Sequence, residues 1–302
     1  MKRSFAFISA LLLIASAADV TPSQTISAPG TANSLDARIR AEVAQFKGKI
    51  SLFAKNLDTG ASYSLGGDNR VRTASTIKVA IMVEAFARVA EGKAKWTDEV
   101  VLTNAKKVTG SGVLQDLSAG LKLTLRDAVT LMMTVSDNTA TNLVLDVLTT
   151  DAVNARMDAL GLRQTRSLRK VGSGGTSRAG EDPALKPFGL GVTTPHEMAT
   201  LLEKLERGQI VSAAVSKEMI DLMKREQHRD GIGRAIVDTE MATKAGALDR
   251  LRSDVGIIYG KQGRVVMAIT CDDMPEIIWS AENPGYLMLS RVSRILIDGL
   301  GK

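Results

Sequence analysis

Residues 75–83 have the sequence Ser-Thr-Ile-Lys-Val-Ala-Ile-Met-Val, in which a polar turn is followed directly by five apolar residues. The apolar character continues to Ala90 and predicts one helix over 75–90, ended by Gly92. Residues three apart on a helix share a face, so the Lys78 amine would lie beside the Ser75 hydroxyl. Burial by the apolar residues would lower the pKa of Lys78 and make its amine a base for the serine. The stretch therefore predicts a nucleophile with its own base.

The same Ser-x-x-Lys pattern also occurs at residues 167–170, and there it lies in an irregular part of the chain. A pattern this short is often a solvated surface pair. Only the copy at 75–78 begins an apolar helix, and a helix start also directs backbone N–H groups at the carbonyl that the serine attacks. The first copy is therefore the candidate catalytic site.

Ser136-Asp137-Asn138 lies in a short polar break between two apolar segments. All three residue types are good helix N-caps, so one interpretation is a cap for a helix over 138–148. The other is functional, with Ser136 relaying a proton and Asn138 donating to a substrate amide.

Lys244-Ala245-Gly246 falls on a predicted strand over 242–247, where glycine lets a ligand approach the backbone and lysine supplies positive charge. Lys-x-Gly recurs at 170–172 and 261–263, so the pattern carries little information alone. Its position after the other two motifs gives it weight.

The remaining periodicity predicts an α+β fold. Strands are expected over 50–54, 61–65, 242–247, 253–259 and 264–270. Helices are expected over 34–47, 125–133, 138–148, 151–160, from Pro195 onward, over 216–227 and over 286–297. We expect one five-stranded antiparallel sheet, flanked by the N- and C-terminal helices, with an all-helical subdomain inserted. Residues 34–302 would form a single domain, with an α/β part (34–70 and 212–302) and a helical part (71–211). A long Gly-, Ser- and Arg-rich loop is predicted over 162–193.

Composition excludes several classes of protein. With 44% hydrophobic and 24% charged residues, the 302-residue chain is neither collagen-like nor largely disordered. One cysteine, Cys271, and two histidines exclude an intrachain disulfide, a Cys-based cluster and a multi-His metal site. No cofactor is implied. The formal charge is +6, and the Lys and Arg residues are interspersed with Asp and Glu instead of clustered. Nucleic-acid binding needs a concentrated basic face, so a nucleic-acid partner is not expected.

The N-terminus is typical of a signal peptide. Lys2 and Arg3 precede an apolar run over 5–17 that ends in Ala15-Ser16-Ala17, a small-residue cleavage pattern. The run is shorter than the ~20 apolar residues that span a bilayer. We expect cleavage after a signal peptide at 1–17, a disordered leader at 18–33, and a secreted or periplasmic protein with no stable membrane insertion.

The three motifs in this order resemble those of the class A β-lactamases and related penicillin-recognising serine enzymes, which carry Ser-x-x-Lys, Ser-Asp-Asn and Lys-Thr-Gly. The likeness runs from about Ser34 to Gly301. It implies that Ser75 is the acylated nucleophile, Lys78 its base and Ser136 a proton relay. Asn138 would contact a substrate amide, and Lys244 would be a cation on the carboxylate side of the pocket. The backbone N–H groups of Ser75 and Ala247 would form the oxyanion hole.

The chain departs from the family pattern in two places. Ala245, beside Gly246 in the substrate-binding strand, replaces the hydroxyl residue that helps hold the substrate carboxylate in the family. Arg252 or Arg250 is expected to supply the lost contact to the carboxylate, unless both are surface residues. The family also has a Glu, in a Glu-Pro-x-Leu-Asn setting, that activates the deacylating water. Counting forward from Gly161 puts Val171 at that place. Local sequence instead favours Asp182-Pro183-Ala184-Leu185-Lys186, with Asp182 or Glu181 as the base.

The resemblance therefore implies a serine hydrolase that acts on β-lactams through an acyl-enzyme on Ser75, with slow deacylation where the base is missing. A D-alanyl-D-alanine peptidase or esterase that binds penicillin stays open, as does a non-catalytic cell-wall-binding protein. The expected partner is a small β-lactam or D-Ala-D-Ala-like molecule, and the expected state is a monomer. A Ser-His-Asp hydrolase is not supported, because no Gly-x-Ser-x-Gly occurs, and His196 and His228 are expected on the surface.

Overall fold

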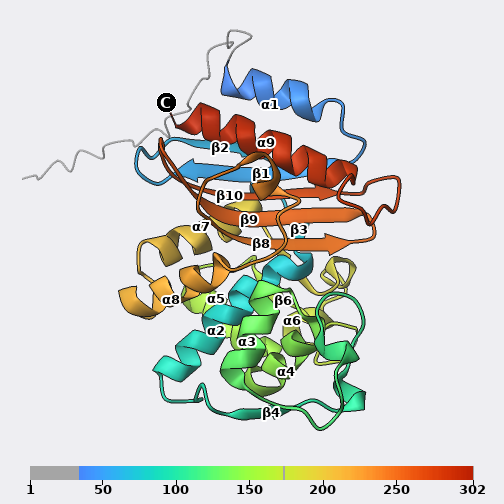
Figure 1. The fold of residues 1–302 in the computed structure, drawn as a ribbon. Coiled ribbons are helices and arrows are strands. Elements are labelled where there is room, and N and C mark those ends of the chain that lie inside the picture. The colour runs from blue at the N-terminus through green and yellow to red at the C-terminus, as the bar shows by residue number, and fades with distance from the viewer. Residues whose placement is uncertain (1–33, 173, 302) are drawn as a thin grey trace, which may run out of the picture.

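The centre of the molecule is a five-stranded antiparallel sheet. The computed structural model describes residues 34–172 and 174–301, so the predicted signal peptide and leader lie outside the described residues. The strand order is β2-β1-β10-β9-β8 (Figure 1). The strands are β1 (Lys49–Asn56), β2 (Ser62–Leu65), β8 (Met241–Leu248), β9 (Leu251–Gly260) and β10 (Gly263–Asp272). Each predicted strand is confirmed, with bounds that differ by a few residues.

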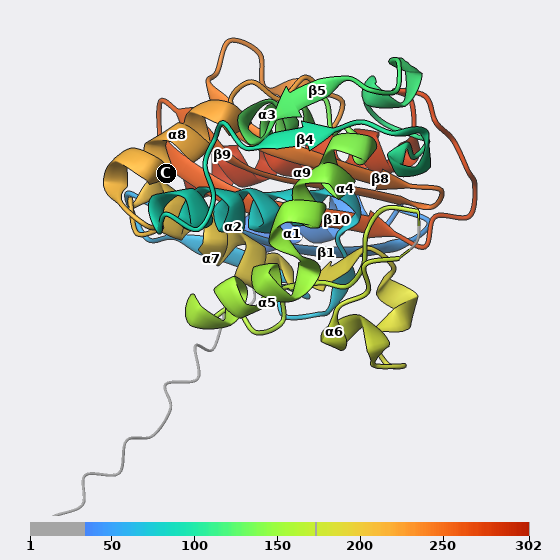
Figure 2. The same cartoon turned by 90° about the horizontal axis from the view of Figure 1, so that it is seen from below.

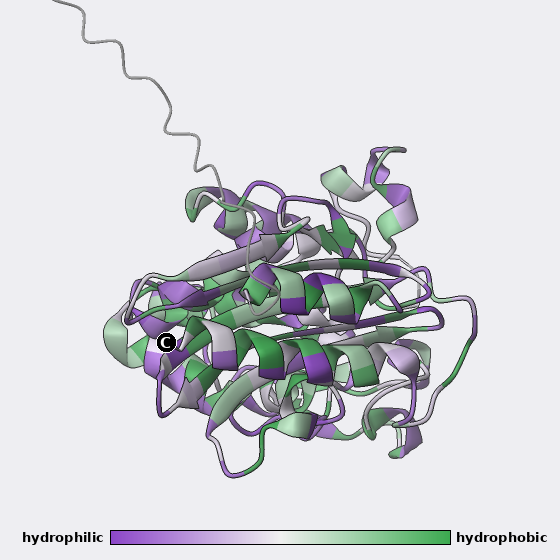
Figure 3. Ribbon diagram, turned by 90° about the horizontal axis from the view of Figure 1, so that it is seen from above, coloured by the Kyte–Doolittle hydropathy of each residue, from purple (hydrophilic) through white to green (hydrophobic). Residues whose placement is uncertain are grey.

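Two terminal helices cover one face of this sheet. They are α1 (Leu35–Val43) and α9 (Pro284–Leu300), which lie side by side above the strands (Figures 1 and 3). Side chains alternate along a strand, so Leu52 and Ala54 of β1 join Leu289 and Val292 of α9 in one core. Phe53, which lies between Leu52 and Ala54 in β1, packs into the core on the other side of the sheet. The predicted α+β architecture is therefore confirmed.

The helical part of the chain lies against the other face, through α7 (Figures 1 and 2). Its centre is α2, in which ten consecutive residues, from Lys78 to Ala87, are buried. The α-helices on this side are α2 (Lys78–Ala90), α3 (Leu125–Thr134), α4 (Asn138–Leu148), α5 (Thr150–Ala159), α6 (Arg178–Glu181), α7 (Pro195–Glu206) and α8 (Ala213–Met223). A helix buried all round is hydrophobic on every face, and this explains the unbroken apolar run after Lys78.

Local signals set several helix ends. Thr124 and Asp127 form the capping box at the start of α3, and the Thr194 hydroxyl accepts the Glu197 N–H at the start of α7. Gly161, with φ +81°, follows the end of α5, where a left-handed residue is favourable.

The structure also contains short elements that the periodicity does not predict. β3 (Val71–Arg72), β6 (Arg166–Ser167) and β7 (Gly191–Thr193) form a three-stranded sheet, and β4 (Glu99–Val101) pairs with β5 (Lys122–Thr124). The predicted loop over 162–193 therefore holds two strands. The 3₁₀ turns are η1 (Ala74–Ile77), η2 (Asn104–Lys106), η3 (Leu114–Asp116), η4 (Lys186–Phe188) and η5 (Ile232–Ala235). Within the described residues, no helix is both long enough and apolar enough to cross a bilayer.

Candidate active site

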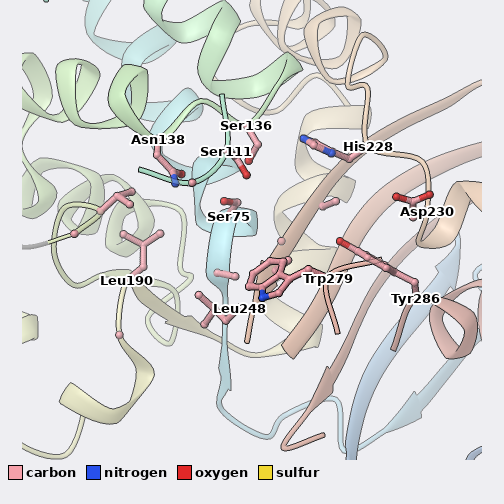
Figure 4. Close-up of a pocket in the computed structure, with 18 of the residues that line it drawn as sticks. Ser75, Ser111, Ser136, Asn138, Leu190, His228, Asp230, Leu248, Trp279 and Tyr286 are labelled. Carbon is pink, nitrogen blue, oxygen red and sulfur yellow. The ribbon is translucent and has the colours of Figure 1, made fainter. Parts of the chain in front are cut away.

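A cavity of about 750 Å³ opens between strand β8 and the helical part of the chain (Figure 4). Six of the predicted site residues line it, and they come from three separate segments of the sequence. These are Ser75, Ser136, Asn138, Ala245, Gly246 and Ala247. Lys78 and Lys244 are fully buried and do not belong to the lining.

Ser75 lies in the 3₁₀ turn η1, one residue after an unusual backbone conformation. Ala74 has φ +46°, in the left-handed region that residues with a Cβ rarely adopt. The turn is fixed by Thr76, whose hydroxyl donates to the Thr73 carbonyl at 2.8 Å. The first part of the predicted helix is thus a tight turn, and it presents the Ser75 side chain to the cavity.

Lys78 begins α2 directly behind the cavity. Its Nζ lies 2.7 Å from the Ser136 carbonyl oxygen, 3.2 Å from Ser136 Oγ and 3.0 Å from Asn138 Oδ1. Burial, and then the positive charge of Lys244, hold the pKa of the Lys78 amine well below its ordinary value of 10.5. The structure therefore has the dry amine that the sequence predicts.

The Ser-Asp-Asn triplet contains the helix cap that is one of the two interpretations of the sequence. Asp137 is the N-cap of α4 and accepts the Ala140 N–H at 2.8 Å through Oδ1. Its Oδ2 accepts the N–H groups of Val113 and Leu114 at 2.7 and 2.9 Å. This cap fixes the residues on either side of Asp137, and both of them line the cavity.

Gly246 allows β8 to touch the turn that carries Ser75. A Cβ at this position would lie 2.9 Å from both the Ser75 nitrogen and the Thr73 carbonyl oxygen, closer than real Cβ atoms approach. The backbone of β8 therefore passes against Ser75. Ala247, the next residue on β8, lines the same cavity as Ser75.

Lys244 forms a buried ion pair that the sequence analysis missed. Its Nζ lies 2.6 Å from Glu226 Oε1 and donates to the Ala245 carbonyl at 3.0 Å. The Glu226 carboxylate also accepts the Ala245 N–H at 2.9 Å. The predicted helix over 216–227 places Glu226 on a helical turn, but α8 ends at Met223. No signal in the local sequence marks this pairing.

A second buried acid lies behind the same strand. Asp254 on β9 pairs across the ladder with Ala245, and its Oδ2 accepts the Ile232 N–H at 2.9 Å. Burial, and then the charge of Glu226, raise the pKa of Asp254 to about 8. The cluster behind the cavity thus holds two lysines and two acids.

Arg252 does not line the cavity, so the prediction that it binds the substrate is wrong. Its guanidinium is fully buried, donates to the carbonyls of Leu248, Leu251 and Ile278, and lies between the rings of Trp279 and Tyr286. These contacts of its two terminal nitrogens join the end of β8 to the segment before α9. Arg250, the alternative, is exposed and is also absent from the lining.

Glu181 and Asp182 are also misplaced by the local alignment. Both are exposed at the end of α6, outside the cavity lining, and Asp182 Oδ1 accepts the Ala184 N–H at 2.9 Å. Neither can serve as the deacylation base in this arrangement. Val171 lines the cavity instead, as counting forward from Gly161 predicts.

Several residues in the cavity wall carry no sequence signal. His228, Asp230, Trp279 and Tyr286 lie on the side of Ser75 away from Asn138 and Leu190 (Figure 4). His228 is exposed, as expected, yet it lines the cavity, whereas His196 stacks on Phe53 elsewhere. Over residues 34–172 and 174–301, no three His, Cys, Asp or Glu side chains are grouped so as to hold a metal ion.

Comparison with known proteins agrees with this geometry. A family model described as "Beta-lactamase enzyme family" matches residues 34–300. Beta-lactamase CARB-3 of Pseudomonas aeruginosa is 25% identical over 232 residues, which cover 75% of this chain and 77% of that protein. The crystal structure of a beta-lactamase from Sphaerobacter thermophilus is 31% identical and covers 90% of this chain and 98% of its own, with a TM-score of 0.78. The structure of PBP-A is 26% identical and covers 87% of this chain and 94% of its own, with a TM-score of 0.76. The chain therefore belongs to the class A β-lactamase family.

Proposed function

We propose that the protein is a serine hydrolase that reacts with β-lactams, forms an acyl-enzyme on Ser75 and releases the product slowly. The observation that carries the proposal is the buried Lys78 amine, held against Ser136 one turn after Ser75 and with a lowered pKa. A solvated lysine is charged and cannot accept a proton, so burial is what makes this pair reactive. The β-lactamase relatives support the substrate class.

In the proposed acylation step, Lys78 is the base for Ser75. An uncharged Lys78 amine has two N–H donors, which the Ser136 carbonyl and Asn138 Oδ1 accept, and one lone pair. That lone pair takes the Ser75 proton as Oγ bonds to the lactam carbonyl carbon. The N–H groups of Ser75 and Ala247 stabilise the resulting oxyanion.

The tetrahedral intermediate then collapses and breaks the C–N bond. The departing nitrogen takes a proton from Ser136 Oγ, and the Lys78 ammonium returns one to that hydroxyl across 3.2 Å. In this scheme Lys244 acts by charge, because after burial its positive charge is the next largest cause of the lowered pKa of Lys78. The step leaves an ester on Ser75 and neutral Lys78.

Hydrolysis of that ester requires an activated water. In the cavity lining near Asn138, Val171 supplies an isopropyl group, which cannot accept a proton. General-base catalysis contributes roughly 10²–10⁴-fold, so the acyl-enzyme should persist. This observation favours a second candidate, a D-alanyl-D-alanine peptidase or esterase that binds penicillin. A solved structure of a PBP-A mutant, 25% identical to this chain, is an acyl-enzyme complex with penicillin G.

The proposal also includes export and a monomeric state. The signal-like sequence at 1–17 supports a secreted or periplasmic protein, where cell-wall peptides and β-lactams are encountered. The expected partner is a small molecule of the β-lactam or D-Ala-D-Ala type.

Intact-protein mass spectrometry after addition of penicillin G tests the proposal. We expect one adduct per chain in the wild type, no adduct in Ser75→Ala, and a lifetime of minutes. Ser167→Ala is the matched control, because Ser167 begins the other Ser-x-x-Lys and is buried in β6. Its adduct should equal that of the wild type. Rapid turnover without accumulation contradicts slow release, and folded wild-type protein that stays unlabelled indicates a non-catalytic protein.

A further inference from the structure

We propose that Arg169 selects an acyl group that carries a carboxylate. The inference deepens the proposed function and rests on it, because in that function Asn138 contacts the amide of the acyl group. Figure 4 shows Asn138 and Leu190 on one side of Ser75, with Asp230 on the other. The acyl group therefore occupies the side of Asn138 and Leu190, which we call the acyl side.

Arg169 lies in the loop between β6 and α6, and its guanidinium contacts the wall of the acyl side. Its Nη1 donates to the carbonyls of Lys170 and Gly172 at 3.0 and 3.1 Å. A Cβ added at Gly189, the residue before Leu190, would lie 3.9 Å from its Nη2. Arg169, Gly172, Gly189 and Leu190 all line the cavity. The guanidinium thus lies between two of the segments that form the acyl side.

The guanidinium of Arg169 keeps donors for a ligand. A guanidinium can donate through each of its nitrogens, and the bonds to the two carbonyls use only Nη1. Among the described residues, no carboxylate pairs with Arg169, and its Nε and Nη2 donate to no protein atom. The side chain is half-buried in the cavity wall. Its Nε and Nη2 form the kind of planar fork that binds a carboxylate through two parallel hydrogen bonds.

The charges around the acyl side also favour an anion. Among the described lining residues, Arg169 is the one Lys or Arg, and Asp230, the one acid, lies on the opposite side of the cavity (Figure 4). Lys170, next to Arg169 in the chain, pairs with Asp146. The same carboxylate also pairs with Lys106 at 3.1 Å, so its charge is already balanced by two lysines.

These donors define the chemical class of the acyl group. A carboxylate close to the acyl amide would gain charge-assisted hydrogen bonds from Arg169, whereas an ammonium in the same place would meet a like charge. A neutral acyl group would leave Nε and Nη2 to water. The departing group lies on the other side of Ser75, so the selection acts on the acyl part alone. The favoured substrate is therefore a β-lactam or peptide ester whose acyl part is acidic.

Three penicillins that differ at one carbon test this selection. On the carbon next to the acyl amide, penicillin G carries hydrogen, carbenicillin a carboxylate and ampicillin an ammonium. We measure the second-order rate constant for acylation of Ser75 by intact mass after timed quenching, at pH 6, where both charged groups are ionised. Each value is divided by the rate of uncatalysed hydrolysis of that penicillin. We expect carbenicillin to exceed ampicillin by about tenfold or more, given one charge-assisted contact.

Variants of Arg169 separate its charge from a structural role in the loop. Arg169→Gln should remove the preference for carbenicillin over ampicillin, and Arg169→Lys, which keeps the charge, should retain most of it. Arg178→Gln is the matched control, because Arg178 is an exposed arginine at the start of α6, outside the lining, and this variant should keep the whole preference. If Arg169→Gln slows all three penicillins by the same factor, the side chain only supports the loop and the inference is wrong.

Salt provides a test on the wild type alone, which does not depend on the folding of any variant. Raising the ionic strength from about 0.05 M to about 0.5 M screens a half-exposed charge, so the ratio of carbenicillin to ampicillin should fall severalfold. Equal rates for the three penicillins, a preference for ampicillin, or a preference that salt or Arg169→Gln leaves unchanged overturns the inference. If penicillin G labels Ser75 but no preference is found, only this inference fails. If penicillin G does not label Ser75, the proposed function fails.

Discussion

The side-chain amide of Asn142 binds both backbone polar groups of Val171. The Val171 N–H donates to Asn142 Oδ1 at 2.9 Å, and Asn142 Nδ2 donates to the Val171 carbonyl at 3.0 Å. Asn142 lies one turn after Asn138 on α4, so these bonds fix Val171 in the cavity wall. The backbone of residue 171 is thus held in the wall of the cavity that Ser75 also lines.

A carboxylate at this position should restore fast deacylation. We expect Val171→Glu to speed decay of the penicillin G acyl-enzyme by about 10²-fold or more, because it adds a general base next to the ester. The decay is followed by intact mass after excess penicillin is removed. Val171→Gln has the same size but no base, so its decay should match that of the wild type. Equal acceleration in both variants would show that side-chain size, and not the base, controls release.

Loss of the buried amine should slow acylation strongly without unfolding the protein. We expect Lys78→Met to slow acylation of Ser75 by penicillin G by about 10³-fold, since the base is gone and the volume is kept. Thermal unfolding should show a Tm equal to or above that of the wild type, because a buried amine is replaced by an apolar group. Acylation at the wild-type rate in this variant would exclude Lys78 as the base.

The close approach of β8 to Ser75 is testable through Gly246. The added methyl group of Gly246→Ala meets the Ser75 nitrogen and the Thr73 oxygen at 2.9 Å, and it must push the strand away. Loss of oxyanion-hole geometry typically costs about 10²–10³-fold in rate, so acylation should fall by that factor. Gly260→Ala, on β9, has its nearest contact at 3.6 Å and serves as the control. Equal acylation rates in the two variants would mean that the contact at Gly246 does not determine the geometry around Ser75.

The buried acid behind β8 should make stability depend on pH. The pKa of Asp254 is about 8 in the native state, against 3.8 for an ordinary aspartate. Between about pH 4 and 8, the native state holds a proton that the unfolded state has released, so the free energy of unfolding falls as pH rises. The slope is at most about 1.4 kcal/mol per pH unit.

Asp254→Asn removes this titration. Urea unfolding at pH 5, 6.5 and 8 should show the variant gaining stability relative to the wild type as pH rises. Asp249→Asn, an exposed acid, should follow the wild type throughout. Parallel curves for the wild type and Asp254→Asn would mean that Asp254 is ionised in the native state.

The sequence predicts the parts of this molecule that depend on regular periodicity. The five strands, the capped starts of α3 and α7 and the apolar helix after Lys78 all follow from residue patterns. The motif residues Ser75, Ser136 and Gly246 line one cavity. This could be predicted only from the resemblance to a known family, because periodicity does not give a tertiary arrangement. The domain boundaries and the roles of these residues stay predictions.

The errors arise where contacts between distant segments override the local pattern. Asp182 matches a family motif in local sequence, yet Asn142 on another helix determines that Val171 faces the cavity. The sequence analysis expects Arg252 to bind a carboxylate, but backbone carbonyls, the Trp279 ring of a distant loop and the Tyr286 ring of α9 bury it. Glu226 lies beyond the true end of α8, where no periodicity indicates its partner.

The account depends most on the protonation of Lys78, and NMR of ¹³C-ε-labelled lysine measures it directly. The Lys78 signal is assigned by its loss in Lys78→Met, and it is followed from pH 5 to 11 in the free protein. Because burial and Lys244 disfavour the ammonium, we predict a midpoint well below 10.5. A Lys78 signal that titrates at or above 10.5 would leave Ser75 without a base and contradict the proposal.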